Sequence, residues 1–403
     1  MKIGIEGQRL FRKNKHGMDV VALELIKNLQ VLDRENEYVV FVRPDEDNTC
    51  IPQAPNFRIV ELGGGTYPLW EQLALPRAVK KEGCDLLHCT SNTAPLLNGV
   101  PTILTLHDII YLEKLSLFQK AGSWYQRIGN TYRRLVVPAV VKKAAKLVTV
   151  SHYERANIEQ YFGPMDKLSV IHNGVGEHFR KIEDTKLLEA VREKYKLPRK
   201  FLFCLGNTDP KKNTPNMLKA FALFRLETGQ KNKGQNQNQN QGDSKSQNQS
   251  ENYKLVLPDY EESQLMQVLR DIGHTEIRED IVMTGYVPNS DMPALLNLCE
   301  LFLYPSLRES FGLPILEAMA CGLPVITSNT SSMPEVAGEA ALLVDPDEPA
   351  AIAGAIGRVL DEEALNARLR AMGPERAAGF SWRGMAEQYL QLYRALFRES
   401  AKQ

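Results

Sequence analysis

The stretch "LFLYPSLRESFGLPILEAMACGLPV", residues 301–325, contains an apolar run, a polar turn and a second apolar run with helical spacing. We interpret "LFLYPS" as a buried strand, "LRESFGLP" as the loop at its carboxyl end, and "ILEAMACG" as the next helix. Glu309 then falls on the loop, and Glu317 about one turn into the helix. In open α/β sheets ligands bind outside the carboxyl ends of strands, and a helix N-terminus there suits a phosphate. The stretch therefore predicts an α/β fold with a ligand site bracketed by two carboxylates.

Short apolar runs alternate with helical segments on both sides of this stretch, which predicts parallel α/β sheets. The pattern runs from "MKIGIEG" to "KLSVIHNG" and restarts at "KFLFCLGN". A chain of 403 residues is long enough for two domains. We predict a first domain at residues 1–175 and a second at 176–380. The polar, low-complexity segment 231–250 interrupts the second domain, and we predict that it is a disordered insertion.

The composition excludes some classes of protein. The formal net charge is +0, so the overall charge does not favour nucleic-acid binding. Six scattered cysteines are typical of reduced thiols, and the N-terminus reads as a strand and not as a signal peptide. No apolar run approaches the roughly 20 residues of a membrane span. We therefore expect a cytoplasmic protein.

Residues 308–325 resemble the E-x7-E signature of the retaining glycosyltransferases of family 4. That family has the GT-B fold, in which two Rossmann-like doubly wound domains face each other across a cleft. The segment "CLGNTDPKKN", residues 204–213, resembles the G-x5-KN donor loop of the family. The resemblance covers nearly the whole chain except the Gln/Asn-rich insertion. It implies an acceptor-side first domain, a donor-binding second domain, and a closing helix at 381–403 that packs back on the first domain.

The resemblance also implies roles for single residues. It places Glu309 and His107 at the reacting sugar, Glu317 at the ribose, and Lys212 at the diphosphate. Gly17 would let an N-terminal loop approach the phosphate or the acceptor. Where the family often has Arg after the donor-loop Gly, this chain has Asn207, so Lys211 is expected to share that work. The implied donor-binding residues are Lys212, Lys211, Asn207, Tyr286, Val287, Phe311, Gly312, Leu313 and Glu317.

The resemblance implies a metal-independent transfer of a hexose from a nucleotide-sugar, with no further cofactor. The donor is GDP- or UDP-linked, and the "PLWEQLALPRA" segment, residues 68–78, resembles mannosyltransferase-like members. The acceptor is a glycan or a lipid-diphosphate-linked glycan. Segment 114–146 is basic, aromatic and free of acids, which suits either a solvated helix or peripheral contact with the inner face of a membrane. The alternatives are a GT-B epimerase and a nucleotide-sugar-binding protein without transfer activity.

Overall fold

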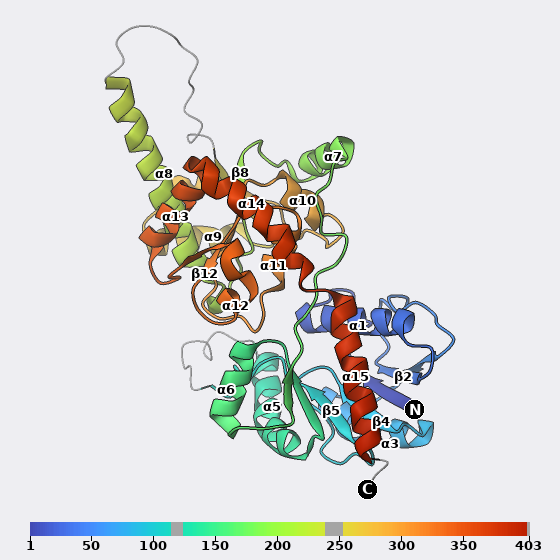
Figure 1. Cartoon of the computed structure of the whole chain (residues 1–403). Coiled ribbons are helices and arrows are strands. Elements are labelled where there is room, and N and C mark those ends of the chain that lie inside the picture. The colour runs from blue at the N-terminus through green and yellow to red at the C-terminus, as the bar shows by residue number, and fades with distance from the viewer. Residues whose placement is uncertain (114–123, 238–252, 401–403) are drawn as a thin grey trace. The chain divides into compact units, whose positions relative to one another are not determined.

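The computed structural model describes residues 1–113, 124–237 and 253–400. The chain divides into two compact units (Figure 1). The N-terminal unit comprises Met1–Gly174 and the C-terminal segment from Phe380 onward, and the C-terminal unit comprises Val175–Gly379. Each unit contains one parallel sheet, which confirms the predicted doubly wound α/β class.

The N-terminal unit is built on a seven-stranded parallel sheet with the order β3-β2-β1-β4-β5-β6-β7. Its strands are β1 (Lys2–Glu6), β2 (Glu37–Val42), β3 (Phe57–Glu61), β4 (Leu86–Cys89), β5 (Thr102–Thr105), β6 (Lys146–Thr149) and β7 (Leu168–Val170). Its helices are α1 (Gly17–Leu32), α2 (Tyr67–Leu69), the π-helix η1 (Trp70–Ala74), α3 (Leu75–Glu82), α5 (Trp124–Lys143), α6 (His152–Phe162) and α15 (Trp382–Ser400).

Helix α15 belongs to the N-terminal unit, although it closes the chain, and it packs against α1. A buried histidine ties it to the sheet. His88 on β4 lies 2.7 Å from the hydroxyl of Tyr393 through Nδ1, and 2.8 Å from the hydroxyl of Thr105 through Nε2. Burial lowers the pKa of His88 to about 3, so its ring is neutral. His88 thus has a structural role, joining α15 to the sheet.

The C-terminal unit is built on a six-stranded parallel sheet with the order β10-β9-β8-β11-β12-β13. Its strands are β8 (Phe201–Cys204), β9 (Lys254–Leu257), β10 (Ile281–Met283), β11 (Leu301–Tyr304), β12 (Val325–Ser328) and β13 (Leu342–Val344). Its helices are α7 (Thr185–Tyr195), the 3₁₀ turn η2 (Pro210–Lys212), α8 (Thr214–Gln237), α9 (Glu262–Ile272), η4 (Thr275–Asp280), α10 (Met292–Leu298), α11 (Leu313–Ala320), α12 (Met333–Ala337), η5 (Gly338–Ala340), α13 (Pro349–Asp361) and α14 (Glu363–Ala378).

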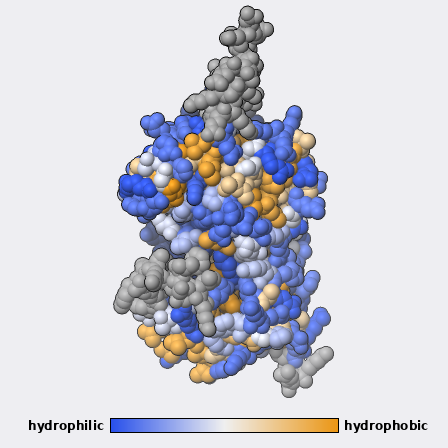
Figure 2. All heavy atoms as spheres, turned by 90° about the vertical axis from the view of Figure 1, so that its left-hand side faces the viewer, coloured by the Kyte–Doolittle hydropathy of each residue, from blue (hydrophilic) through white to orange (hydrophobic). Residues whose placement is uncertain are grey.

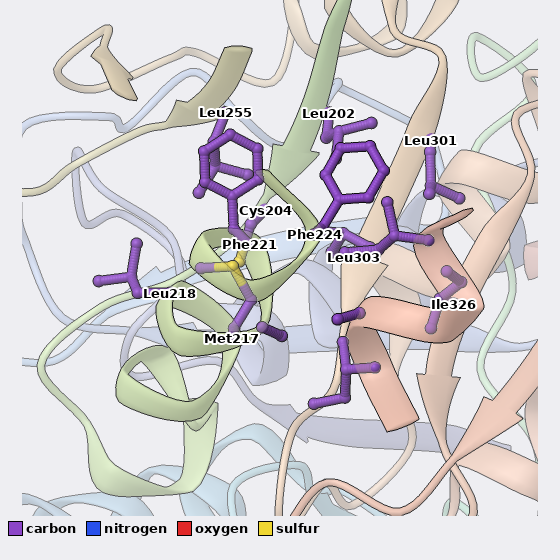
Figure 3. Close-up of a cluster of buried hydrophobic side chains, with 14 of the residues drawn as sticks. Leu202, Cys204, Met217, Leu218, Phe221, Phe224, Leu255, Leu301, Leu303 and Ile326 are labelled. Atoms are coloured by element: carbon purple, nitrogen blue, oxygen red, sulfur yellow. The ribbon is translucent and has the colours of Figure 1, made fainter. Parts of the chain in front are cut away.

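The core of the C-terminal unit lies where α8 covers its sheet. Met217, Leu218 and Phe221 of α8 are fully buried and belong to one cluster with Leu202 and Leu303 of the strands (Figure 3). Helix α8 continues as far as Gln237. The predicted disordered insertion at 231–250 is therefore wrong at its beginning, because the helix carries on through the first polar residues. The insertion's later residues, from 238, lie outside the described part of the chain.

Each sheet has one point at which the strand order reverses. In the N-terminal unit the reversal falls between β1 and β4, and in the C-terminal unit between β8 and β11. Loops leaving the carboxyl ends of two such neighbours diverge to opposite sides of the sheet and leave a crevice between them, in which α/β proteins bind ligands. The fold thus singles out the loops after β8 and β11, and the loops after β1 and β4.

Candidate active site

The loop after β8 is fixed by short local contacts. Asp209 caps the turn η2 by accepting a hydrogen bond from the backbone N–H of Lys211 at 3.1 Å. Asn213 closes the turn with a left-handed backbone, at φ 57°. Its side-chain amide donates to the carbonyls of Pro305, at 3.0 Å, and Pro346, at 2.7 Å. Because Pro305 follows β11 directly, Asn213 ties this loop to the neighbouring strand end.

Lys212 and Glu309 meet at the reversal point between β8 and β11. The ammonium of Lys212 lies 2.7 Å from Oε1 of Glu309, and it donates to the hydroxyl of Tyr304 at 2.7 Å. The side chains of Lys212 and Glu309 are only 17% and 12% exposed. Two predicted site residues 97 positions apart therefore form a largely buried ion pair.

The charges around Glu309 keep its carboxylate ionised. Burial by itself would raise the pKa of Glu309, but the positive charges of Lys212 and Lys211 lower it, and the resulting pKa lies below its ordinary value. The hydrogen bonds from Lys212 and Tyr304 act in the same direction. A fixed negative charge at this point favours a ligand atom that becomes positive during a reaction.

A glycine shapes the start of α11, beside Glu309. Gly312 has a φ of 106°, a conformation that L side chains rarely adopt. A Cβ at this position would lie 3.1 Å from Cδ1 of Ile315. Phe311 before it is buried, and Leu313 opens the helix. Pro314 has no backbone N–H, and the N–H of Ile315 donates to the Gly312 carbonyl at 3.0 Å. The turn thus places the N-terminus of α11, the positive end of its helix dipole, at the carboxyl end of the sheet, where it suits an anionic group.

Glu317 lies inside α11, as the E-x7-E spacing predicts. Its side chain is partly buried, and it makes no hydrogen bond within the ranges that the structure describes. Burial raises the pKa of Glu317 to about 7. The two carboxylates therefore differ in chemistry: Glu309 is paired and ionised, whereas Glu317 is unpaired and half-protonated near neutral pH.

Comparisons with known proteins agree with this geometry. Residues 189–376 match the family described as glycosyl transferases group 1, and residues 16–178 match glycosyltransferase family 4. The O-antigen chain mannosyltransferase B of Escherichia coli is 32% identical over 298 residues, which are 73% of this chain and 70% of that protein. The chain belongs to the family 4 glycosyltransferases. The serotype-specific mannosyltransferase WbdA of Escherichia coli is 31% identical over 78% of this chain, but the match spans only 36% of that longer protein.

Solved structures show which fold this glycosyltransferase has. Sucrose-phosphate synthase from Thermosynechococcus elongatus aligns with a TM-score of 0.75 and 21% identity over 99% of both chains. The lipopolysaccharide glycosyltransferase WaaG aligns with a TM-score of 0.69 and 14% identity, over 97% of this chain and 99% of that one. At these identities the likeness concerns the fold alone, which is GT-B. Enzymes of this class transfer a glycosyl group from a nucleotide-sugar.

Residues that the sequence did not single out also build the glycosyltransferase site. The Ser331 hydroxyl accepts from the backbone N–H of Glu309 at 3.0 Å, and the Ser332 hydroxyl donates to the carbonyls of Glu309, at 2.9 Å, and Phe311, at 2.8 Å. Both serines thereby hold the loop that carries Glu309. Tyr304 could have been predicted from the sequence, because it is the polar residue at the end of the apolar strand "LFLY". The adjacent serines in "SSMPEV", residues 331–336, were the only sequence signal for the other contact.

The other predicted donor-binding residues differ in their surroundings. Lys211 points its ammonium at Asp209, 3.6 Å away, and its charge still reaches Glu309. Asn207 lines a hollow of about 650 Å³ between the β8 loop and α9. Tyr286 and Val287 follow β10, with β9 between that strand and β8, and no hydrogen bond links them to Glu309 within the described ranges. Tyr286 is 62% exposed, and Val287 is buried.

The two predicted N-terminal residues lie in the other unit. His107 follows β5 and is 5% exposed. Burial lowers its pKa, so the ring is neutral at neutral pH. Gly17 is the first residue of α1, and a Cβ there would meet no atom within 4 Å. Gly17 therefore has the free space that a close ligand needs. None of the described helices is both long and apolar enough to cross a bilayer.

Proposed function

We propose that this glycosyltransferase transfers a mannosyl group, with retention of configuration, from GDP-mannose to a growing glycan. The observation that carries the proposal is the contact of Lys212 with Glu309 at the reversal point of the C-terminal sheet. The proposed sugar rests on relatives named mannosyltransferases at 32%, 31% and 28% identity. UDP-glucose, which is bound in the solved structure of HepE from Anabaena at 18% identity, is the competing donor class.

The proposed chemistry assigns one task to each group. The bond from the anomeric carbon to the diphosphate oxygen breaks, and the electron pair leaves with the diphosphate. Lys212 and the N-terminus of α11 stabilise that charge, as oriented donors and helix dipoles do for developing anions. Glu309 stabilises the positive charge on the sugar. The acceptor hydroxyl attacks from the same face and gives its proton to the departing phosphate oxygen.

The ion pair of Lys212 and Glu309 changes role when the donor binds. Without a ligand the ammonium neutralises the Glu309 carboxylate. A diphosphate beside η2 competes for the same ammonium. We propose that binding draws Lys212 toward the phosphates and leaves Glu309 free to face the sugar, so that the full carboxylate charge is exposed only when the donor is present.

Thermal stabilisation by a panel of nucleotide-sugars, with activity measured in parallel, tests the proposed donor. A ligand at 100 times its dissociation constant raises the free energy of unfolding by about 2.7 kcal/mol. We expect GDP-mannose and GDP to raise the melting temperature and UDP-glucose and UDP to do so less. Equal or greater stabilisation by the uridine ligands would contradict the GDP assignment.

Release of GDP from GDP-mannose without an acceptor separates the enzyme from the two alternatives. A transferase is expected to release GDP slowly, because water replaces the acceptor. A nucleotide-sugar-binding protein would bind GDP-mannose without releasing GDP. An epimerase would instead return a second sugar with the nucleotide still attached, which NMR of the recovered donor would detect.

We also propose that the protein works in the cytoplasm at the inner face of a membrane, on a lipid-diphosphate-linked acceptor. The proposal rests on exposed leucines beside basic residues in the N-terminal unit. Leu135 on α5 is 74% exposed and Leu97 in the loop after β4 is 79% exposed. The Lys143 ammonium donates to the carbonyl of Leu96 at 3.2 Å, so the basic end of α5 lies beside that loop. Figure 2 shows apolar side chains gathered on the surface of the part of the molecule that carries α5.

Flotation with vesicles tests this membrane contact. Arg133 and Arg134 are basic residues of the same helix, but reversing their charge would also disturb the fold. Arg134 donates to the Tyr111 carbonyl at 2.6 Å, and Arg133 lies over the Tyr111 ring. We expect Leu135→Glu to reduce binding to vesicles containing phosphatidylglycerol. Leu226→Glu on α8, which replaces a leucine exposed in the other unit, is the matched control. Equal flotation of both variants and the wild type would contradict the proposal.

A further inference from the structure

The loop after β4 is held by two buried acids. Its residues Thr90–Thr93 follow β4 directly, at the point where the strand order of the N-terminal sheet reverses between β1 and β4. Glu6 ends β1 and is 1% exposed, and Glu71 on the π-helix η1 is fully buried. A buried carboxyl group costs far more than an apolar side chain of similar size unless its hydrogen bonds are made. Each acid makes part of its hydrogen bonds to this loop, Glu6 to Thr90 and Glu71 to Thr93, so the loop is held at both ends.

Glu6 holds the start of the loop. Its carboxylate accepts from the backbone N–H of Thr90 at 3.3 Å and from the Thr90 hydroxyl at 3.3 Å. The same hydroxyl lies 2.9 Å from the backbone carbonyl of Glu6, and the other carboxylate oxygen accepts from the backbone N–H of Gln8 at 2.9 Å. Thr90 is thereby fixed through both its main chain and its side chain.

Glu71 holds the end of the loop. Its carboxylate accepts hydrogen bonds from the hydroxyls of Thr93 and Tyr132, from the hydroxyl of Tyr67 at 2.7 Å, and from the Gln72 amide at 3.0 Å. Four donors thus surround one carboxylate in the interior. The π-helical turn matters here, because single π turns occur mostly inside α-helices and often at functional sites. Trp70–Ala74 separates α2 from α3 and carries both Glu71 and Gln72.

The loop in turn holds His107 from two sides. Asn92 has a left-handed backbone, at φ 67°, which is uncommon for a residue other than glycine. Its side-chain oxygen accepts from the backbone N–H of His107 at 2.6 Å. Nε2 of His107 lies 3.0 Å from the carbonyl of Thr90. A carbonyl only accepts hydrogen bonds, so Nε2 carries the proton and Nδ1 is the acceptor.

We propose that Glu6 and Glu71 are positioning residues, which clamp the Thr90–Thr93 loop so that His107 is fixed as the Nε2–H tautomer and offers Nδ1 to a sugar hydroxyl. Nδ1 makes no hydrogen bond within the described ranges, so its lone pair has no partner in that part of the chain. The identity of that hydroxyl, on the donor sugar or the acceptor, rests on the proposed function. The tautomer itself does not, so it can be tested without any substrate.

Nitrogen NMR of the full-length protein, labelled with ¹⁵N at its seven histidines, measures the tautomer directly. The signal that disappears in His107→Gln belongs to His107. We expect wild-type His107 to show a protonated Nε2 and an unprotonated Nδ1. Glu6→Leu removes the carboxylate that accepts from the backbone N–H of Thr90 and should give a mixture of tautomers. Glu6→Gln keeps an acceptor oxygen and should keep the wild-type tautomer.

A second pair of variants covers the case in which Glu6→Leu does not fold. Thr90→Val removes the hydroxyl that bonds Glu6, and Thr90→Ser restores it. We expect Thr90→Val to mix the tautomers and to lower kcat for GDP release from GDP-mannose roughly 10- to 100-fold, the scale of a misplaced catalytic group, with a smaller change in KM. Thr90→Ser should recover both. An Nδ1–H tautomer in the wild type, or a single unchanged tautomer in both Glu6→Leu and Thr90→Val, would overturn the proposal. If GDP-mannose is not a substrate, the kinetic effect is lost while the NMR result stands.

Discussion

The pH dependence of GDP binding tests the assignment of Glu317 to the ribose. Burial raises the pKa of Glu317 to about 7, and the side chain makes no hydrogen bond in the described ranges. The carboxylate form offers both oxygens as charged acceptors to the two ribose hydroxyls, whereas the protonated form turns one of them into a donor. With a pKa near 7, about nine tenths of the carboxyl is ionised at pH 8 and about one tenth at pH 6. We therefore expect the Kd for GDP to rise roughly tenfold from pH 8 to pH 6, or about 1.4 kcal/mol.

Isothermal titration at several pH values, beside Glu317→Gln as the control, makes this measurement. The control is needed because the terminal phosphate of GDP also titrates in this range. Glu317→Gln reports only the titration of GDP and of other groups, and the difference between the two proteins belongs to Glu317. At pH 8 we expect the variant to bind GDP about 10- to 100-fold more weakly, from the 1.5–3 kcal/mol of hydrogen bonds to a charged group.

The sign of the effect is fixed by the direction of the pKa shift. Ligand binding favours the ionised form, so the wild type should release close to one proton per GDP near pH 6 and almost none at pH 8. Buffers with different ionisation enthalpies reveal that proton in the measured heat. If the Kd values of wild type and Glu317→Gln change in parallel between pH 6 and pH 8, Glu317 does not bind the ribose as a carboxylate.

Three further predictions concern the stability of the folded protein. Glu317→Gln should be more stable than the wild type at pH 8 and equal to it near pH 4.5. The reason is that the raised pKa of Glu317 in the folded wild type gives stability that is lost as the pH rises through about 7. Melting temperatures of the two proteins that differ by the same amount at every pH would contradict this. Lys212→Ala leaves the Glu309 carboxylate without its partner, so we expect the free energy of unfolding, measured with denaturant, to fall by about 3–5 kcal/mol and GDP to bind more weakly. Lys211→Ala should cause smaller losses, and equal losses in the two variants would count against the ion pair. Gly312→Ala adds a Cβ to a residue with a φ of 106°, which should lower the free energy of unfolding by about 1–3 kcal/mol. Gly17→Ala adds a Cβ in open space and should change it little. The reverse order of the two effects would refute the argument.

Local patterns in the sequence were enough to predict the order of strands and helices in the fold. Apolar runs of strand length followed by helical spacing predicted both parallel sheets, and the E-x7-E spacing placed Glu309 on a loop and Glu317 in α11. Such patterns repeat along the chain, so they report the order of elements well. They predict the ends of helices less well. The polar residues from Lys231 onward suggested that the helix had ended, yet α8 continues to Gln237.

Contacts between distant segments were beyond the sequence. The pairing of Lys212 with Glu309 depends on β8 and β11 lying side by side, which only the strand order reveals. Glu6 and Glu71 gave a weak signal, since an acid at a strand end or in a helix usually faces water. Their burial follows from the π-helical turn and from the hydroxyls around them, and neither is written in a local pattern.

The roles of the two glutamates in the C-terminal unit are the central claim, and Glu309→Gln tests it most directly. The variant keeps an acceptor oxygen and removes the charge that would stabilise a cationic sugar. We expect kcat for GDP release from GDP-mannose to fall about 10²–10³-fold, the range for one electrostatic contact. Since Lys212 then loses its carboxylate partner, GDP itself should bind as tightly as before or more tightly. A Glu309→Gln protein that keeps its kcat but binds GDP more weakly would contradict the account.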